Sequence, residues 1–156
     1  MRKGMFALAA VGLLATSSMA ACGDDSSDTP SGGASGAASA GKVGVILPDT
    51  KSSQRWGTDD PKFLKAAFDA AGVQVDIQNA QGDKAAFQTI ADGMISSGVK
   101  VLMIVNLDSG TGKAVLDKAK NAGIATIDYD RLTLNGGANY YVSFDNVKVG
   151  ELQGQG

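Results

Sequence analysis

The sequence predicts an α/β protein built on a doubly wound parallel sheet of flavodoxin-like order. From Lys42 onward, short Val- and Ile-rich runs alternate with amphipathic helical segments, the pattern of repeated strand–helix units. Three of the helical segments end at a glycine directly before the next apolar run. These glycines are 26 and then 25 residues apart, which would also suit a solenoid, but no leucine-rich or ankyrin consensus is present. Units of this length normally pack as right-handed crossovers, so a parallel sheet is expected.

Five strands are predicted, the first four from Val- and Ile-rich runs of the kind that a parallel sheet buries on both faces. They cover residues 43–47, 73–77, 99–105, 124–129 and 140–144. The fifth run follows a polar turn at Asn135-Gly136-Gly137, which separates it from the fourth. One further helix is predicted at residues 146–153, after the fifth strand.

The three helices between the strands are predicted from their caps and apolar stripes. Asp60 is the expected cap of the first, with Pro61 at its first position; Asp83 is the cap of the second, and the third opens near Ser109 or Thr111. The stripes expected to face inward are Phe63, Leu64, Ala67, Phe68 and Ala71; Phe87, Ile90, Ala91, Met94 and Ile95; and Val115, Leu116, Ala119 and Ala122. The three glycines, expected as left-handed helix stops, are Gly72, Gly98 and Gly123.

The amino-terminal segment has the pattern of a targeting sequence. Residues 1–22 combine a basic start with an apolar stretch too short to span a bilayer, which predicts an export signal. Met19-Ala20-Ala21-Cys22 resembles the cleavage box of bacterial lipoproteins, in which Cys22 would carry the lipid; an ordinary cleaved signal is the alternative. Residues 23–41 lack aromatic and β-branched aliphatic side chains and predict a flexible tether. The folded domain is therefore expected at residues 42–156, held at the outer face of the membrane.

Composition excludes several classes of function. A net charge of -2 argues against binding nucleic acid, and the absence of histidine removes the commonest general base and metal ligand. The glycine-rich segment 109–113 fails the phosphate-loop pattern, because Leu107 and Ala114 occupy its glycine and Ser/Thr positions. No G-x-G-x-x-G turn follows the first strand. We therefore expect no cofactor, no metal and no enzymatic activity.

Polar side chains follow three of the predicted strands. Ligands of open parallel sheets bind beyond the carboxyl ends of the strands, where these side chains would converge. An Arg fork beside a carboxylate offers fixed donors and acceptors to hydroxyl groups, and an indole offers a flat apolar face. The residues therefore predict a site for a polyhydroxylated ligand, made of Asp49, Arg55, Trp56, Asn106, Asp130 and Arg131.

Other interpretations of these residues stay open at the level of sequence. Asp130 and Arg131 could form a surface ion pair, and Arg55 could be solvated. Trp56 could be a buried anchor beneath the first loop, and Asn106 could cap the helix that follows it. Three carboxylates, Asp49, Asp108 and Asp130, could also converge on a metal as in phospho-receiver domains. That interpretation needs paired acids after the first strand and a particular lysine later in the chain, and an exported protein has little use for a cytoplasmic kinase partner, so it is disfavoured.

Four segments together resemble the amino-terminal lobe of type 1 periplasmic sugar-binding proteins, with the xylose-binding branch as the nearest pattern. They are residues 42–47, Gln54-Arg55-Trp56, Tyr129-Asp130-Arg131 and residues 142–150. The resemblance implies an exported, monomeric receptor that captures a monosaccharide, xylose or a similar sugar, for the permease of an ABC transporter. It also implies hinge closure of two lobes around the sugar.

The resemblance assigns roles to individual residues. Arg55 would bond ring or hydroxyl oxygens, Trp56 would pack on the sugar face, and Asp130 with Arg131 would bind neighbouring hydroxyls bidentately. Asp49 and Asn106 would lie at the rim of the pocket. Asp145-Asn146 would stabilise the turn near the hinge.

The chain departs from the family in ways that set further expectations. Family members are longer, with a second lobe and a returning segment that completes the first, so we expect a truncated lobe that binds sugar weakly or not at all on its own. A small complete domain is the alternative. The acidic Asp59-Asp60-Pro61 replaces a more basic helix start and leaves the particular sugar open.

Two other functions share this fold. A transcription-regulator effector domain would need a helix-turn-helix where the export signal stands. A membrane-anchored sugar sensor or interaction domain is the alternative that the sequence leaves open.

Overall fold

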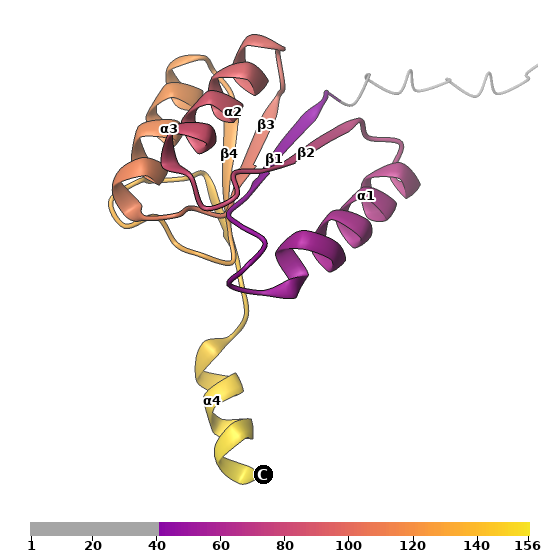
Figure 1. Ribbon diagram of the computed structural model, residues 1–156, viewed down its shortest axis with the longest axis vertical. Helices are drawn as coiled ribbons and strands as arrows, with labels where there is room; N and C mark the ends of the chain where they lie inside the picture. The colour runs from indigo at the N-terminus through magenta and orange to yellow at the C-terminus, as the bar shows by residue number, and fades with distance from the viewer. Residues whose placement is uncertain (1–40) are drawn as a thin grey trace, which may run out of the picture. The chain divides into compact units, whose positions relative to one another are not determined.

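The computed structural model describes residues 41–156 and contains the predicted parallel sheet (Figure 1). Its five strands lie in the order β2-β1-β3-β4-β5 and all pairs are parallel, as the flavodoxin-like prediction requires. The strands are β1 (Val43–Leu47), β2 (Val75–Asn79), β3 (Val101–Ile104), β4 (Ala125–Tyr129) and β5 (Tyr140–Val142). The order reverses between β1 and β3, which makes the carboxyl ends of these two strands the expected place for a ligand.

The strands match the predicted runs with small shifts at their ends. β1 is buried at all five positions, as expected for a strand covered on both faces. β2 begins two residues later than predicted, because the Val73 N–H still bonds to Phe68 O at the end of the preceding helix. β5 ends at Val142, two residues before the predicted limit.

The two layers of helices cover opposite faces of the sheet. One face carries α1 (Asp60–Ala70), and the other carries α2 (Lys84–Ser96) and α3 (Ser109–Asn121) (Figure 1). The last helix, α4 (Asn146–Gln155), is exposed at every position. The carboxylates of Asp83 and Asp145 cap α2 and α4 by accepting bonds from Ala86 N and Lys148 N.

The predicted cap of the first helix is wrong. A π-helical turn, η1 (Arg55–Asp59), leads directly into α1, so both Asp59 and Asp60 have helical backbone angles and neither side chain caps. The Asp60 carboxylate contacts Arg55 instead. Pro61 does occupy the first turn, where its missing N–H costs no hydrogen bond.

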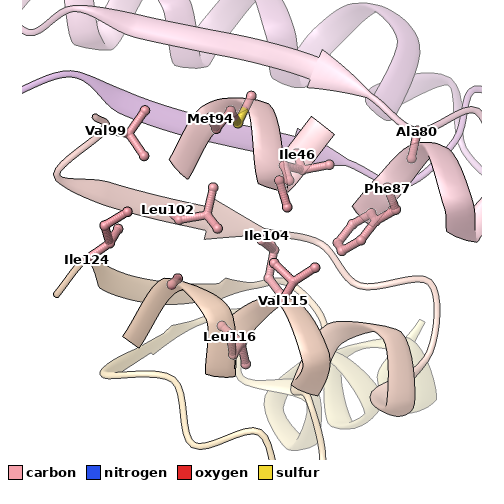
Figure 2. Close-up of a cluster of buried hydrophobic side chains, with 12 residues drawn as sticks. Ile46, Ala80, Phe87, Met94, Val99, Leu102, Ile104, Val115, Leu116 and Ile124 are labelled. Carbon is pink, nitrogen blue, oxygen red and sulfur yellow. The ribbon is translucent and has the colours of Figure 1, made fainter. Parts of the chain in front are cut away.

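The main core lies between the sheet and helices α2 and α3 (Figure 2). Phe87 and Met94 of α2, with Val115 and Leu116 of α3, pack onto Ile46, Leu102 and Ile104 of the sheet. All of these side chains are at most 1% exposed. Burial of each large side chain contributes about 1.5–3 kcal/mol, so this layer is the principal source of stability.

A second core lies beneath α1 and is less complete. Leu64 and Phe68 are the members of the predicted α1 stripe that pack on it, and both stay partly exposed. Phe63 is 64% exposed and Ala67 and Ala71 are exposed, so their predicted burial is wrong. Trp56 of η1 also belongs to this core, and of the α1 stripe only Leu64 and Phe68 pack against it. Ala122, predicted to face inward from the third helix, is also exposed, because it lies at the helix end.

The predicted left-handed helix stops are confirmed. Gly72, Gly98 and Gly123 have φ angles of 67°, 78° and 71°. A side chain in this region of backbone space would be strained, which is the physical reason for glycine at all three positions.

The targeting segment, Cys22 and the tether up to residue 40 lie outside the described residues. Within the part of the chain that the structure describes, none of the helices has the length and apolar character needed to span a bilayer.

Candidate ligand-binding site

The candidate site lies at the carboxyl edge of the sheet. The loop after β1 brings Asp49 there, the start of η1 brings Arg55 and Trp56, and the loop after β4 brings Asp130 and Arg131. Arg55 Nη1 donates to Asp130 Oδ1 over 2.9 Å, although the two residues are 75 positions apart in the chain. The sheet order therefore joins the two polar clusters that the sequence singled out.

Arg55 is the centre of this cluster. Its Nε and Nη2 donate to the two oxygens of Asp60 at 3.3 and 3.2 Å, and Nη2 also donates to the Tyr129 hydroxyl at 3.3 Å. Burial lowers the pKa of Arg55, but the hydrogen bonds with Asp60, Tyr129 and Asp130 outweigh it and raise the pKa above its usual value. Arg55 is thus a permanently charged group held between two carboxylates, not a solvated side chain.

This ion pair leaves hydrogen-bonding capacity open. Four of the five N–H groups of a guanidinium are used by Arg55 within residues 41–156, which leaves one on Nη1. In the same part of the chain, Asp130 Oδ2 accepts no hydrogen bond from a side chain or backbone. A donor and an acceptor therefore lie next to each other, on the two members of one ion pair.

Trp56 is a buried anchor in this structure. The indole is 3% exposed and belongs to the core cluster of Val43, Leu47 and Val105. The Arg55 guanidinium carbon lies 4.1 Å from the centroid of its ring, a favourable cation–π distance. Direct packing of this ring on a ligand, the predicted role, stays a prediction; what the geometry shows is a ring that supports Arg55.

Tyr129, at the end of β4, completes the support. Its ring meets Trp56 edge to face, with the centroids 6.3 Å apart and the planes at 87°. Burial, and then the negative charge of Asp60, raise the pKa of the Tyr129 phenol. The hydroxyl therefore stays protonated at neutral pH while it accepts the bond from Arg55.

The backbone at Asp130 has an unusual conformation. Asp130 has a φ angle of 64°, a region that non-glycine residues rarely occupy. Its N–H donates to Val142 O at 2.8 Å, and its carbonyl accepts bonds from the Tyr141 and Ser143 hydroxyls at 3.2 and 3.0 Å. Such strain persists where surrounding contacts hold it, and it is concentrated at functional sites. β5 and Ser143 directly after it thus hold the backbone conformation from which the Asp130 side chain starts.

Arg131 has more open hydrogen-bond donors than Arg55. Its Nη1 donates to Asn106 O at 3.1 Å, and no other bond of its side chain is formed within residues 41–156. Its guanidinium carbon lies 5.7 Å from the Trp56 ring centroid, so the two arginines share one aromatic support. Arg131 is therefore the side chain with most capacity to donate hydrogen bonds to a ligand.

Asn106 is buried and holds the Arg131 loop. Its Nδ2 donates to Arg131 O at 3.3 Å and to Thr133 Oγ1 at 2.8 Å. Thr133 in turn donates through N and Oγ1 to the fully buried Asp128, at 2.8 and 2.7 Å. The interpretation of Asn106 as a helix cap is wrong, because Asp108 caps α3. Its predicted place at the pocket rim stays a prediction.

Asp49 orders the loop after β1. Its carboxylate accepts bonds from Lys51 N and from the N–H and hydroxyl of Ser52. The bonds from Ser52 are the main cause that lowers the pKa of Asp49, and the charge of Arg131 adds to it. Asp49 is therefore ionised at neutral pH and stabilises a turn at the edge of the cluster.

The three carboxylates of the metal interpretation do not form a metal site. Within residues 41–156, no group of three or more potential ligands is close enough to hold a metal ion. Asp108 is occupied by the Thr111 N–H and hydroxyl and by Lys84 Nζ at 3.0 Å. These contacts, the Thr111 backbone bond first, lower the pKa of Asp108.

Several site residues were missed by the sequence reasoning. Asp60 and Tyr129 bind Arg55, and Thr133 fixes the Arg131 loop. Asn79, at the end of β2, donates to both Asp49 O and Trp56 O and so ties the first loop to the sheet. Position alone could have indicated Asn79 and Tyr129, because each is the last residue of a strand at the carboxyl edge.

The fold and the cluster together define an α/β ligand-binding domain of the periplasmic binding protein class. A sequence profile described as periplasmic binding protein domain matches residues 43–156, and the chain belongs to this family. The predicted family resemblance is thus confirmed.

Relatives of known name agree with the family. The multiple sugar-binding periplasmic receptor ChvE of Rhizobium radiobacter is 43% identical over 118 residues, which are 75% of this chain and 33% of the receptor. The D-xylose-binding periplasmic protein of Haemophilus influenzae is 38% identical over 72% of this chain and 33% of its own length. The chain thus spans about a third of the relatives it matches.

A solved structure gives the same result. The ABC transporter solute binding protein of Clostridium phytofermentans, with bound β-D-glucose, is 37% identical and aligns with a TM-score of 0.64. The alignment covers 73% of this chain and 35% of that protein.

Proposed function

We propose that this chain is one lobe of an extracytoplasmic solute-binding protein that captures a monosaccharide, xylose or a similar sugar, for an ABC transporter. The observation that carries the proposal is the pair Arg55–Asp130, with its adjacent open donor and acceptor, beside the open donors of Arg131. Relatives described as sugar receptors and a neighbour solved with bound glucose support this assignment.

The chemistry of the cluster suits neighbouring hydroxyl groups. A hydroxyl both donates and accepts, so one hydroxyl can donate to Asp130 Oδ2 while its neighbour accepts from Arg55 Nη1 or from Arg131. Bonds to ionised groups are about twice as strong as neutral ones, which offsets the loss of water from the sugar. Arg55 is already neutralised by Asp60 and Asp130, so the cluster favours an uncharged ligand over an anion.

A complete receptor requires more than this lobe. In the proposal, a second lobe closes over the sugar by a hinge motion, and the permease of the transporter recognises the closed form. Cys22 carries the lipid, residues 1–22 direct export, and residues 23–41 tether the domain at the outer face of the membrane as a monomer. The role is binding and not catalysis, as it is for the relatives described as receptors and binding proteins.

Isothermal calorimetry tests the proposal. The complete product of the gene that contains this sequence is titrated with a panel of pentoses and hexoses, with residues 41–156 as a parallel sample. Binding by the complete product, with weak or no binding by residues 41–156, is the expected result. Absence of binding by both would overturn the proposal in favour of a membrane-anchored sensor or interaction domain.

A further inference from the structure

Arg55 has two carboxylate partners that hold different edges of its guanidinium. Asp60 accepts from Nε and Nη2, at 3.3 and 3.2 Å, and so occupies one side of the fork with both of its oxygens. Asp130 accepts from Nη1 alone, at 2.9 Å. A two-bond contact fixes the orientation of a planar group, whereas a one-bond contact leaves it free to turn. Of the two carboxylates, Asp60 therefore sets the orientation of Arg55, and the Tyr129 hydroxyl adds one more acceptor on Nη2.

The contact with Asp60 depends on the local backbone. In η1 the hydrogen bonds run from residue i+5 to residue i, and the Asp60 N–H donates to Arg55 O. In an α-helix the donor to Arg55 O would instead be the N–H of Asp59, four residues further along the chain. The wider turn brings Asp60 over Arg55 and leaves Asp59 exposed. Turns of this kind are frequently found at functional sites.

Burial separates the roles of the two carboxylates. The side chain of Asp60 is 12% exposed, compared with 19% for Asp130 and 26% for Arg55. Both Asp60 oxygens are engaged by Arg55, whereas Asp130 keeps Oδ2 open within the described residues. Asp60 is thus placed to act on Arg55, and Asp130 is placed to act on a ligand.

We propose that Asp60 is a positioning residue: by holding Nε and Nη2 it lays the Arg55 guanidinium on Trp56 and limits its pairing with Asp130 to one bond, which keeps an Asp130 oxygen available for a sugar hydroxyl. Without Asp60, Arg55 can turn its fork to Asp130 and occupy both carboxylate oxygens. The inference rests on the proposed function for the identity of the ligand. The placement of Arg55 by Asp60 does not depend on it.

The first readout needs no ligand. The chain has three arginines, Arg2, Arg55 and Arg131, so the ¹⁵Nε signals of the full chain are few enough to assign by substitution. In Asp60→Asn we expect the Arg55 Nε–H to exchange with solvent roughly ten times faster or more, because its acceptor is weakened. Asp59→Asn, the exposed neighbour, is the matched control and should leave the signal unchanged. Asp60→Glu keeps a carboxylate at this position and should retain much of the wild-type protection of the Arg55 Nε–H from exchange.

The second readout is sugar affinity of the complete gene product, with D-xylose and D-glucose as probes. Asp60→Asn should lower the affinity for the sugar that the wild type binds by about fivefold to tenfold. This factor corresponds to the cost of ordering one long side chain on binding. Asp59→Asn should bind as the wild type does. Urea unfolding midpoints of all variants show whether a loss of affinity reflects a loss of folding.

The outcomes are distinguishable. Unchanged exchange at Arg55 in a folded Asp60→Asn variant overturns the inference, and so does unchanged affinity for a sugar that the wild type binds. If the wild type binds neither probe nor any sugar of the panel, the proposed function fails, and the positioning of Arg55 is then decided by the exchange measurement alone.

Discussion

Replacing Thr133 by Val removes one hydroxyl from the buried network that holds the Arg131 loop. Thr133 Oγ1 donates to Asp128 Oδ1 at 2.7 Å and accepts from Asn106 Nδ2 at 2.8 Å. Thr133 is 2% exposed and Asp128 is fully buried, so water does not replace either bond. Valine has nearly the same shape as threonine, and the change therefore tests the hydrogen bonds with little effect on packing.

The expected loss follows from these two bonds. A hydrogen bond to a carboxylate contributes about 1.5–3 kcal/mol and a neutral hydrogen bond about 1 kcal/mol. In the variant, buried Asp128 loses a donor and buried Asn106 loses an acceptor. We expect Thr133→Val to lower the free energy of unfolding by about 3 kcal/mol, a large share of the roughly 5–15 kcal/mol of a typical domain. With an m-value of about 1–3 kcal/mol/M in urea, this loss lowers the urea midpoint by roughly 1–3 M.

The assay is urea unfolding of residues 41–156, followed by fluorescence of Trp56, the single tryptophan of the sequence. Thr89→Val is the control, because Thr89 is exposed and its hydroxyl bonds only to Ala85 O within its own helix. The control should change stability by no more than about 0.5 kcal/mol. If Thr133→Val costs no more than Thr89→Val, the buried network does not hold the loop, and the account of Asn106 and Asp128 fails.

Three further changes test other parts of the structure. Arg131→Met keeps an unbranched apolar stem but removes the guanidinium and its donors. It should weaken sugar binding by the complete gene product by at least about tenfold, the size of one to two charged hydrogen bonds. Equal affinity in calorimetry would show that Arg131 does not contact the sugar. Gly112→Ala places a Cβ 2.9 Å from Asn106 Cβ and from Thr133 Oγ1 and should lower the urea midpoint. Gly93→Ala, with open space around its Cβ, is the control and should not lower it. Equal midpoints of the two variants would contradict the close contact of α3 with Asn106 and the Arg131 loop. Because burial and Asp60 raise the pKa of Tyr129, its phenol should ionise above about pH 10. The stability that the neutral phenol contributes is present below about pH 10 and is lost as the pH rises through the pKa that Tyr129 has in the folded state. Tyr129→Phe should remove this late step from the ultraviolet titration of tyrosinate, and an unchanged titration would refute it.

The parts of the fold that could be predicted are those whose signals are local. The β1 run is apolar at every side chain because both of its faces are covered, and the glycines after the helices are required by their positive φ angles. Asp83 caps α2 through a bond to a residue three positions away, a contact that sequence spacing reveals. Such features depend on few neighbours, so residue type and spacing are sufficient to find them.

The parts that were missed depend on contacts between distant segments. Phe63 is exposed because of the way α1 is placed on the sheet. An apolar stripe in the sequence does not specify that placement. The bonds from Asn106 to the Arg131 loop join positions 25 to 27 residues apart. η1 could not be predicted, because a π-helical turn has no distinctive side-chain period and here accompanies the ion pair of Arg55 with Asp60.

The proposed function depends on sugar binding at the carboxyl edge of the sheet through Arg55, Asp130 and Arg131. The most direct test is a ¹H–¹⁵N spectrum of the complete gene product titrated with D-xylose and D-glucose, because chemical shifts report which residues lie next to the sugar. We expect shifts at the Asp130 backbone amide and at the Nε signals of Arg55 and Arg131, with the amides of the opposite sheet edge unmoved. Shifts confined to another part of the surface, or none at sugar concentrations well above millimolar, would contradict it.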